Sequence, residues 1–416
     1  MVTKVVRQPI ISSNKELLGY EILYQDGASS LYNQADTQAA NAIENFLLEF
    51  DSEKFLEGKT AFLTFTPNLL LKNIPRMFKP EKLVIQIEDS SIIHPLAQKI
   101  IYRYKKQGYK IAVKNFEFSP RYFALLDVVD IIKLDFAKLD VSQKSIVDIG
   151  ESFQKQIIAY NVNTPEAYAH AIELGCKYLQ GTAVAEAMSS QVKRMDHMQS
   201  NFFQLVVAVT KDEPDVDAIA EIISRDVTLA FSLIKLVNSA YFALRNKAKS
   251  VKQALVVLGL GQLKQWVYLL SFKQSDGQFS TELVKISFLR ANFCSELSQF
   301  IPNLPISKSE AYLMGMFSTL GLLMEVPLED ALTELPISDE VKQALLTGEG
   351  RCGMLYRLVG AYEKASWDEV STKARELNIP ENIISQKYFE CVEYVNQIWS
   401  ELMSVSDEVE KVDDEK

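Results

Sequence analysis

Histidine and cysteine are scarce in this chain of 416 residues, and neither is arranged to bind a metal. The histidines are His94, His170 and His197, so the second half of the chain has none. The cysteines are Cys176, Cys294, Cys352 and Cys391, with no Cys-x-x-Cys spacing and no adjacent histidine. Because zinc sites need such clusters, we expect no zinc centre, four reduced thiols, and histidines at surface or capping positions.

Long apolar runs are also lacking. The most apolar stretch, residues 254–272, is interrupted by polar residues that include Gln262 and Lys264, which excludes a membrane span. The first eleven residues contain Lys4 and Arg7 and no long apolar core, so they do not form a signal peptide. We therefore expect a cytoplasmic protein that is not bound to a membrane.

The net charge of −10, without a long run of Lys or Arg, argues against nucleic acid as a partner. Hydrophobic residues make up 48% of the chain and charged residues 24%, as in ordinary soluble globular proteins. A chain of this length is too long for a single hydrophobic core. We therefore expect at least two domains.

Short β-rich runs alternate with helical segments through residues 1–192, and this alternation predicts a (β/α)8 barrel of the TIM type. The predicted strands are Lys4–Ile11, Leu18–Tyr24, Ala61–Thr66, Leu83–Ile87, Lys110–Val113, Ile131–Leu134, Gln156–Ala159 and Tyr178–Ala183. The predicted helices between them include Gln34–Phe50, Ile92–Gln107, Arg121–Leu126 and Thr164–Leu174.

Helical periodicity replaces the β-rich runs after residue 198, so residues 198–400 are expected to form an all-helical domain. Asp215 is positioned as the N-cap of its first amphipathic helix. Gly259-Leu260-Gly261 lacks a third glycine and a preceding strand, so it predicts a turn between helices and not a dinucleotide loop. The later predicted helices are Lys285–Phe300, Ser309–Met324, Val341–Leu346, Met354–Lys364, Trp367–Glu376 and Ile383–Met403. An acidic tail follows over residues 401–416, and we expect it to be frayed from Ser406 onward.

Three motifs in the first half follow one another in the order found in a family of signalling enzymes. They are Gly19-Tyr20-Glu21-Ile22-Leu23, Lys133-Leu134-Asp135 and Gly175-Cys176-Lys177-Tyr178-Leu179-Gln180-Gly181. Through these motifs residues 1–190 resemble the EAL family of cyclic di-GMP phosphodiesterases. The resemblance implies an active site at the carboxyl ends of the barrel strands, where carboxylates and an asparagine hold two metal ions that activate a water.

The same resemblance identifies departures from the metal site of that family. The signature and strand positions that match the family are Glu21, Lys133, Asp135 and Gln180. The positions that have lost a metal ligand or a charge are Gln25, Thr64, Gln86, Lys114, Asn115, Tyr160 and Asn163. Because two hard cations need several anionic oxygens, we expect no bound metal, no cofactor and no catalysis at this site.

Lys114 adds a repulsive element to the site. An ammonium about 4 Å from a dication costs about 4 kcal/mol per unit of metal charge at an effective dielectric constant of 20. We expect Lys114 to pair with Glu21 or Asp135 and so fill the vacated metal site. One alternative keeps an enzyme: Glu88 lies two residues after Gln86, on the same side of the strand, and Glu21, Glu88 and Asp135 could form a single-metal site.

The helical half has a resemblance of its own, carried by Asp226, Asn238-Ser239-Ala240, Ser250-Val251, Ala254 and Leu258-Gly259. These residues resemble the HDOD family, a relative of the HD phosphohydrolases that is generally regarded as non-catalytic. Ser318-Thr319 stands where the His-Asp pair of the HD enzymes would be expected. With no histidine after His197, this half cannot form a histidine–carboxylate metal centre.

These observations predict a non-enzymatic bacterial signal-transduction protein, in which both domains serve as interaction surfaces. By resemblance, its partners would be a kinase, a response regulator or components of motility or biofilm machinery, and a homodimer is possible. A second hypothesis is a receptor that binds cyclic di-GMP without cleaving it, through the candidate residues Glu21, Lys133 and Gln180. A third is a weak metal-dependent phosphodiesterase that uses the single-metal site.

Overall fold

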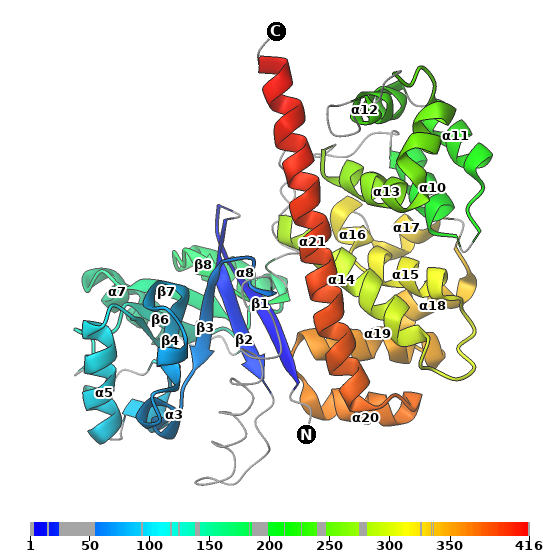
Figure 1. Cartoon of the computed structure of the whole chain (residues 1–416). Helices are drawn as coiled ribbons and strands as arrows, with labels where there is room; N and C mark the ends of the chain where they lie inside the picture. The colour runs from blue at the N-terminus through cyan, green and yellow to red at the C-terminus, as the bar shows by residue number, and fades with distance from the viewer. Residues whose placement is uncertain are drawn as a thin grey trace. The chain divides into compact units, whose positions relative to one another are not determined.

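The computed structural model describes residues 4–414, apart from several segments. The segments outside the description are 15, 25–54, 93–94, 117–118, 124, 138–141, 183, 185–198, 212, 226, 239–246, 274–280, 325–326, 334 and 336. The predicted helix Gln34–Phe50 and the expectations for Gln25, His94, His197 and Asp226 therefore lie outside the described residues. The chain forms two compact units, drawn in Figure 1. The first contains residues 1–188 and 361–367, and the second contains 189–360 and 368–416.

Eight strands form a closed barrel in the order of the sequence. They are β1 (Val5–Ser12), β2 (Leu17–Tyr24), β3 (Thr60–Thr64), β4 (Leu83–Ile87), β5 (Lys110–Lys114), β6 (Ile131–Asp135), β7 (Gln156–Tyr160) and β8 (Tyr178–Leu179). All eight predicted strands are present, although β8 contains only two residues. From β2 to β8 neighbouring strands are parallel.

The first strand departs from the expected pattern of a (β/α)8 barrel. β1 pairs antiparallel with both β2 and β8, so the barrel is not parallel throughout. The cause is local: between Ser12 and Leu17 the chain has too few residues for a crossover helix, which parallel neighbours require. The expected alternation of strand and helix is therefore wrong at this connection, while the barrel itself is confirmed.

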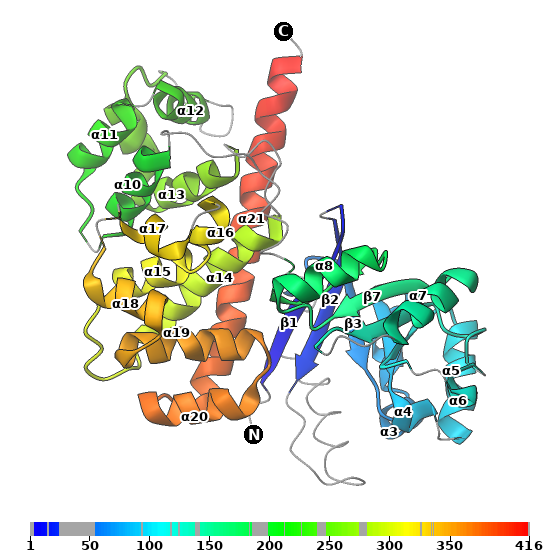
Figure 2. The ribbon, with the colours of Figure 1, turned by 180° about the vertical axis from the view of Figure 1, so that it is seen from behind.

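Short helices cover the outside of the barrel (Figure 2). They are α3 (Pro67–Leu71), α4 (Asp89–Ile92), α5 (Pro95–Lys106), α6 (Pro120–Phe123), α7 (Ser142–Ser152) and α8 (Pro165–Glu173), with 3-10 turns η1 (Ile74–Met77) and η2 (Pro80–Lys82). Thr66 and Thr164 cap α3 and α8 with their hydroxyl groups, and each helix has a proline in its first turn.

The barrel interior consists of layers of side chains. The innermost layer is apolar and contains Ile10, Phe62, Val84, Ala112, Ile131 and Ile158, with Leu18 and Tyr178 packed against it. Because side chains alternate along a strand, the residues two positions nearer the strand ends face the same interior. A second layer, described below, therefore lies directly above the apolar one.

The regular elements that the structure describes in the second unit are all helices. Its helices are α10 (Gln199–Thr210), α11 (Val216–Ser224), α12 (Val227–Val237), α13 (Val251–Lys273), α14 (Thr281–Ser298), α15 (Lys308–Phe317), α16 (Leu320–Met324), α17 (Leu328–Thr333), α18 (Asp339–Thr347), α19 (Gly350–Glu363), α20 (Trp367–Leu377) and α21 (Glu381–Asp414). The predicted fold class, a TIM-type barrel followed by an all-helical domain, is confirmed. α21 continues to Asp414, so the acidic segment is helical where we expected a frayed tail.

Several local predictions in this unit are confirmed. Asp215 caps α11 by accepting hydrogen bonds from the backbone of Asp217 and Ala218. α13 is interrupted at Gly259, whose φ of 72° and ψ of 159° are not helical. The turn predicted at Gly259-Leu260-Gly261 therefore exists as a kink between two helical pieces.

Both units have a core of buried apolar side chains. All four cysteines are free and buried, as the sequence predicts. Within the described part of the chain, no helix combines the length and apolar character needed to cross a membrane.

Candidate functional site

A polar layer lies at the carboxyl ends of the barrel strands. Thr64, Gln86, Lys114, Lys133 and Tyr160 each follow a residue of the apolar layer by two positions. Strand register brings them side by side: Thr64 pairs with Gln86, and Lys114 pairs with Lys133. The structure thus gathers the positions that the EAL resemblance singled out.

Glu21 is the centre of this layer and is almost completely buried. Its Oε1 accepts hydrogen bonds from Gln86 Nε2 at 2.9 Å and from Lys114 Nζ at 3.4 Å. Its Oε2 accepts from Lys133 Nζ at 2.8 Å and from Gln180 Nε2 at 2.5 Å. Each carboxylate oxygen already has two donors, so the residue has little capacity left for a further ligand.

Lys133 and Gln180 complete the buried network. Lys133 Nζ also donates to Gln180 Oε1 at 2.9 Å, and Gln180 Nε2 lies 3.0 Å from Gln8 Oε1. Glu21, Lys133 and Gln180, the three candidate ligand-binding residues, are therefore brought together, but their polar atoms bind one another. Gln8 is a member that the sequence interpretation missed.

The charges around Glu21 decide its ionisation. Burial would raise the pKa of the Glu21 carboxyl, but the ammonium groups of Lys133 and Lys114 outweigh burial and hold this pKa well below its usual range. Burial lowers the pKa of the Lys133 ammonium, and the Glu21 carboxylate opposes that change. We conclude that Glu21 remains an anion that its own protein neutralises.

Lys114 lies between two carboxylates. Its Nζ is 3.4 Å from Glu21 Oε1 and 4.0 Å from Glu88 Oε1. Of the two expected partners it pairs with Glu21. Asp135 instead accepts hydrogen bonds from the Ala137 backbone at 2.8 Å and from Asn161 Nδ2 at 2.9 Å.

Tyr160 fills space beside the two ammonium groups. Its ring centroid lies 5.1 Å from Lys114 Nζ and 5.4 Å from Lys133 Nζ, both within cation–π range. Its hydroxyl donates to Asn115 Oδ1. Burial raises the pKa of the Tyr160 phenol, and the nearby Asp135 and Glu21 carboxylates raise it further. Tyr160 is therefore a neutral donor and not an anionic metal ligand.

Three asparagines at the carboxyl ends of β5 and β7 have structural roles in this chain. Asn115 and Asn161 follow β5 and β7 with φ of 54° and 57°, a left-handed conformation that asparagine tolerates. Asn163 Oδ1 accepts from the Thr182 backbone at 2.9 Å and so joins the loops after β7 and β8. These amides fix the rim of the barrel without adding negative charge.

The side-chain oxygens available as metal ligands at this end of the barrel do not fit a pair of divalent cations. Glu21 is saturated, Gln86 is neutral, and the Lys114 ammonium separates Glu21 from Glu88. Among the residues that the structure describes, no three His, Cys, Asp or Glu side chains are grouped to hold a metal. Gln86 Oε1 is buried without a hydrogen-bond partner, and one neutral amide oxygen cannot replace a set of carboxylates.

In the helical unit, the positions where the HD enzymes would have a His-Asp pair contain two hydroxyl side chains, Ser318 and Thr319. Thr319 Oγ1 shares a hydrogen bond with Ser287 Oγ, and Arg290 Nη1 donates to Ser318 Oγ at 3.2 Å. Ser318 is the C-cap of α15 and donates to the Gly315 carbonyl at 2.7 Å. Ser318 and Thr319, which stand where His-Asp would be expected, thus join α14 to α15.

The histidine that the structure describes also has a structural role. His170 Nε2 lies 3.2 Å from Gln143 Oε1, and its ring packs 5.8 Å from that of Phe136. It lies on α8, outside the strands.

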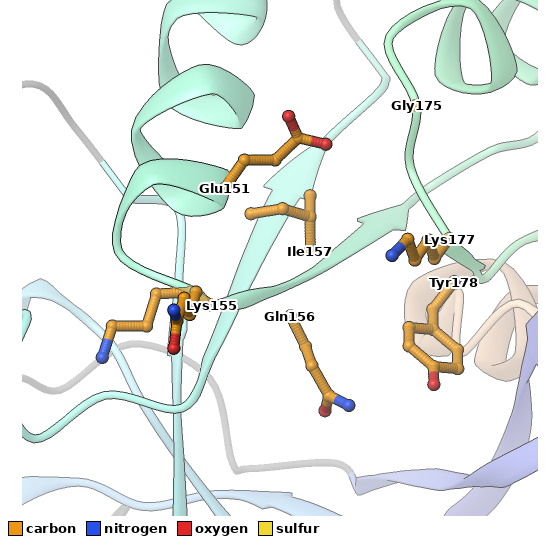
Figure 3. A pocket seen from close by; sticks show the side chains of 8 residues that line it. Glu151, Lys155, Gln156, Ile157, Gly175, Lys177 and Tyr178 are labelled. Carbon is orange, nitrogen blue, oxygen red and sulfur yellow. The ribbon is translucent and has the colours of Figure 1, made fainter.

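A pocket of about 490 Å³ opens at the opposite, amino-terminal ends of β7 and β8 (Figure 3). It is lined by Glu151, Gln154, Lys155, Gln156, Ile157, Gly175, Lys177 and Tyr178. In Figure 3 the polar groups of Gln156, Lys177 and Tyr178 do not converge on one point. Gly175, Lys177 and Tyr178 belong to the third EAL motif, but the sequence analysis assigned no ligand to them.

Comparison with known proteins places this architecture in a family. The EAL domain matches residues 29–187 and the HDOD domain matches residues 195–346. The protein YuxH of Bacillus subtilis is 30% identical over 405 residues, covering 95% of this chain and 98% of YuxH. The chain belongs to the EAL–HDOD family. The domain order predicted from the motifs is therefore confirmed.

Other relatives of this EAL–HDOD protein are more distant. The cyclic di-GMP phosphodiesterase CdgJ of Vibrio cholerae is 26% identical over 407 residues, covering 96% of this chain and 92% of CdgJ. Among solved structures, Vibrio cholerae LapD, bound to c-di-GMP, matches 44% of this chain and 53% of its own, with 16% identity and a TM-score of 0.36. The EAL domain of Mycobacterium smegmatis DcpA matches 43% of this chain and 90% of its own, with 16% identity and a TM-score of 0.35.

Proposed function

We propose that this EAL–HDOD protein is a non-enzymatic regulator in bacterial cyclic di-GMP signalling, in which both domains act through contacts with other proteins. The observation that carries the proposal is the Glu21 network. The Glu21 carboxylate, buried at this end of the barrel, is bound by two ammonium groups and two amides of its own chain. Hydrolysis by two metal ions requires anionic oxygens that this arrangement lacks.

The same network argues against cyclic di-GMP as a ligand held by Glu21, Lys133 and Gln180. These side chains are buried and hydrogen-bonded to one another, so a nucleotide would have to break those bonds before gaining its own. Lys114, whose side chain is partly exposed, is also paired with Glu21, so its charge is already balanced within the chain.

A second candidate function is favoured by the similarity to CdgJ, whose name states that it is a cyclic di-GMP phosphodiesterase. A phosphodiesterase here would need the single-metal site of Glu21, Glu88 and Asp135. Lys114 lies between the first two of these, and Asp135 is bound to Asn161. We therefore rank this candidate below the non-enzymatic one.

The test uses the full chain, cyclic di-GMP, and either Mg²⁺ or Mn²⁺. Chromatography measures formation of the linear dinucleotide, and calorimetry measures binding with and without the metal. We expect neither turnover nor heat. Turnover that disappears in a Glu21→Gln variant would overturn the proposal in favour of the enzyme, and metal-independent heat would favour a receptor.

A further inference from the structure

The stretch around α13 differs in charge from the rest of this acidic protein. From Val227 to Ser275 the chain contains no Asp or Glu, although the net charge of the whole chain is −10. The same stretch contains seven basic residues: Lys235, Arg245, Lys247, Lys249, Lys252, Lys264 and Lys273. One part of the helical unit is therefore locally cationic.

Large apolar side chains are exposed within this cationic stretch. Val256 is 79% exposed, Leu260 is 40% exposed and Val257 is 37% exposed, all within five residues of α13. Apolar side chains exposed so close together in the sequence are candidates for an interaction site. We call Val256, Val257, Leu260 and Gly261 the α13 strip.

The kink at Gly259 shapes this strip. With its φ of 72° and ψ of 159°, Gly259 has a backbone conformation that is essentially restricted to glycine. A Cβ added at Gly259 or at Gly261 would meet no atom within 4 Å, so no neighbouring side chain covers either position. The strip is therefore open at the point where the two helical pieces meet.

The HDOD motif residues hold the start of α13 in place. Asn238 Nδ2 donates to the Ala248 carbonyl at 2.9 Å, and its Oδ1 accepts from the Ala248 backbone at 2.8 Å. Ser250 Oγ accepts from the Gln253 backbone at 3.2 Å and so caps the helix. A fixed helix start gives the strip a defined position, as a docking surface requires.

A lysine brackets each end of the strip. Lys252 precedes Val256 by four residues, and Lys264 follows Leu260 by four, so each lysine lies one helical turn from an exposed apolar side chain. Lys252 pairs with Asp217 at 2.6 Å, and both side chains are mostly exposed, so this pair costs little to exchange. A partner with acidic residues beside an apolar face would match this pattern.

We propose that the α13 strip docks an acidic amphipathic helix of a partner protein. The inference deepens the proposed function, on which it rests, by naming a face of the HDOD domain and the chemistry of what it binds. Charge complementarity between the acid-free stretch and acidic residues supplies orientation. The aliphatic side chains at the centre favour a protein over nucleic acid, which would be bound through aromatic and polar groups.

The test uses a synthetic helical peptide with leucine on one face and glutamate on the other, labelled for fluorescence anisotropy with the full chain. We expect saturable binding that weakens as salt is raised. The double variant Val256→Glu/Leu260→Glu should lose about tenfold or more in affinity. Lys252→Glu/Lys264→Glu should show a comparable loss. Leu346→Glu is the matched control, because Leu346 is exposed to a similar extent (44%) on α18.

The remaining outcomes would overturn the inference. They are absence of peptide binding, equal loss in the Leu346→Glu control, or stronger binding of an RNA oligonucleotide that the same double variants abolish. Dissociation of a dimer by Val256→Glu/Leu260→Glu in light scattering would assign the strip to a second copy instead. Peptide binding that appears only after residues 406–416 are removed would assign it to the chain's own acidic segment. Because none of these measurements uses cyclic di-GMP, failure here is distinguishable from turnover in the earlier assay.

Discussion

Glu21 accepts four hydrogen bonds, and the donors are side chains of the same barrel. Among the described residues, removing its charge leaves Lys133 buried without a counter-ion and Lys114 paired with Glu88 alone. Burying an unpaired charge is among the most destabilising changes that a protein can suffer. Glu21 should therefore matter for stability, whatever its part in function.

Glu21→Gln should lower the free energy of unfolding by about 3–5 kcal/mol, because one member of a buried pair is lost. The control is Glu88→Gln, which removes a half-exposed partner and should cost at most about 1 kcal/mol. Urea denaturation followed by circular dichroism measures both. An equal loss in the free energy of unfolding for the two variants would contradict the conclusion that Glu21 neutralises a buried charge.

The stability contributed by Glu21 should also depend on pH. The folded-state pKa of Glu21 lies below its ordinary value of 4.5, so the unfolded state binds a proton first as pH falls. The contribution is therefore fully present above about pH 5 and declines as the pH falls below 4.5 toward the folded-state pKa. Urea titrations of wild type and Glu21→Gln should give a stability difference that is constant near neutrality and narrows in acid.

Restoring acids should restore affinity for a divalent cation. Lys114→Asp together with Gln86→Glu removes the ammonium between Glu21 and Glu88 and adds two carboxylates beside Glu21. We expect this double variant to bind Mn²⁺ at least about tenfold more tightly than wild type in calorimetry. Lys177→Asp, at the other end of the barrel, is the control and should behave as wild type. No gain in affinity would mean that the barrel excludes the metal for another reason.

Sequence patterns identified most of these residues but not all of their contacts. The resemblance to the EAL family identified Glu21, Lys133 and Gln180. Gln8 was missed because β1 is antiparallel, so the residue nearer the barrel end precedes the core residue Ile10 instead of following it. A polar side chain in a buried strand was the available signal. Which carboxylate Lys114 would choose depends on rotamers and loop geometry, which motifs do not encode.

At the scale of helices and strands, apolar periodicity predicted where elements lie but not their direction or closeness. β-rich runs located all eight strands and the glycine pattern located the turn at Gly259, yet neither indicated that β1 is antiparallel, because a β-rich run looks the same in both directions. Periodicity also does not predict how closely two helices pack. α14 and α15 approach so closely that a Cβ on Gly315 would lie 2.2 Å from the Arg290 carbonyl oxygen.

Gly315→Ala should therefore destabilise the helical unit by about 1–3 kcal/mol, because the helices must separate to admit a methyl group. Gly360 offers a matched control: it is also helical, but an added Cβ there meets no atom within 4 Å. Gly360→Ala should stabilise by about 0.5–1 kcal/mol through helix propensity. Thermal unfolding measures the change in stability of each variant. A change of the same sign in both would argue against the close approach of α14 and α15.

At the scale of the whole molecule, the buried thiols are distributed so that they report on each unit. Cys176 belongs to the first unit, and Cys294, Cys352 and Cys391 belong to the second. Burial raises the pKa of the Cys176 thiol to about 12 and that of Cys352 to about 11, from 9.0. Few thiolates therefore form near neutral pH, and buried thiols react slowly with alkylating reagents.

Pulsed alkylation at pH 8 should label none of the four cysteines rapidly in the native protein. With rising urea, Cys176 should become reactive when the barrel unfolds, and the other three together when the helical unit unfolds. Mass spectrometry of the peptides measures each site. Rapid native labelling of Cys176 would contradict its burial.

The ammonium groups that neutralise Glu21 are covalent parts of the polypeptide, and this has a consequence for biosynthesis. A folded state that depends on a dissociable ion gains stability by mass action and loses it when that ion is scarce. A barrel that supplies its own counter-charges is free of this dependence. Cells starved of manganese or magnesium should therefore accumulate this protein to the same level as well-supplied cells.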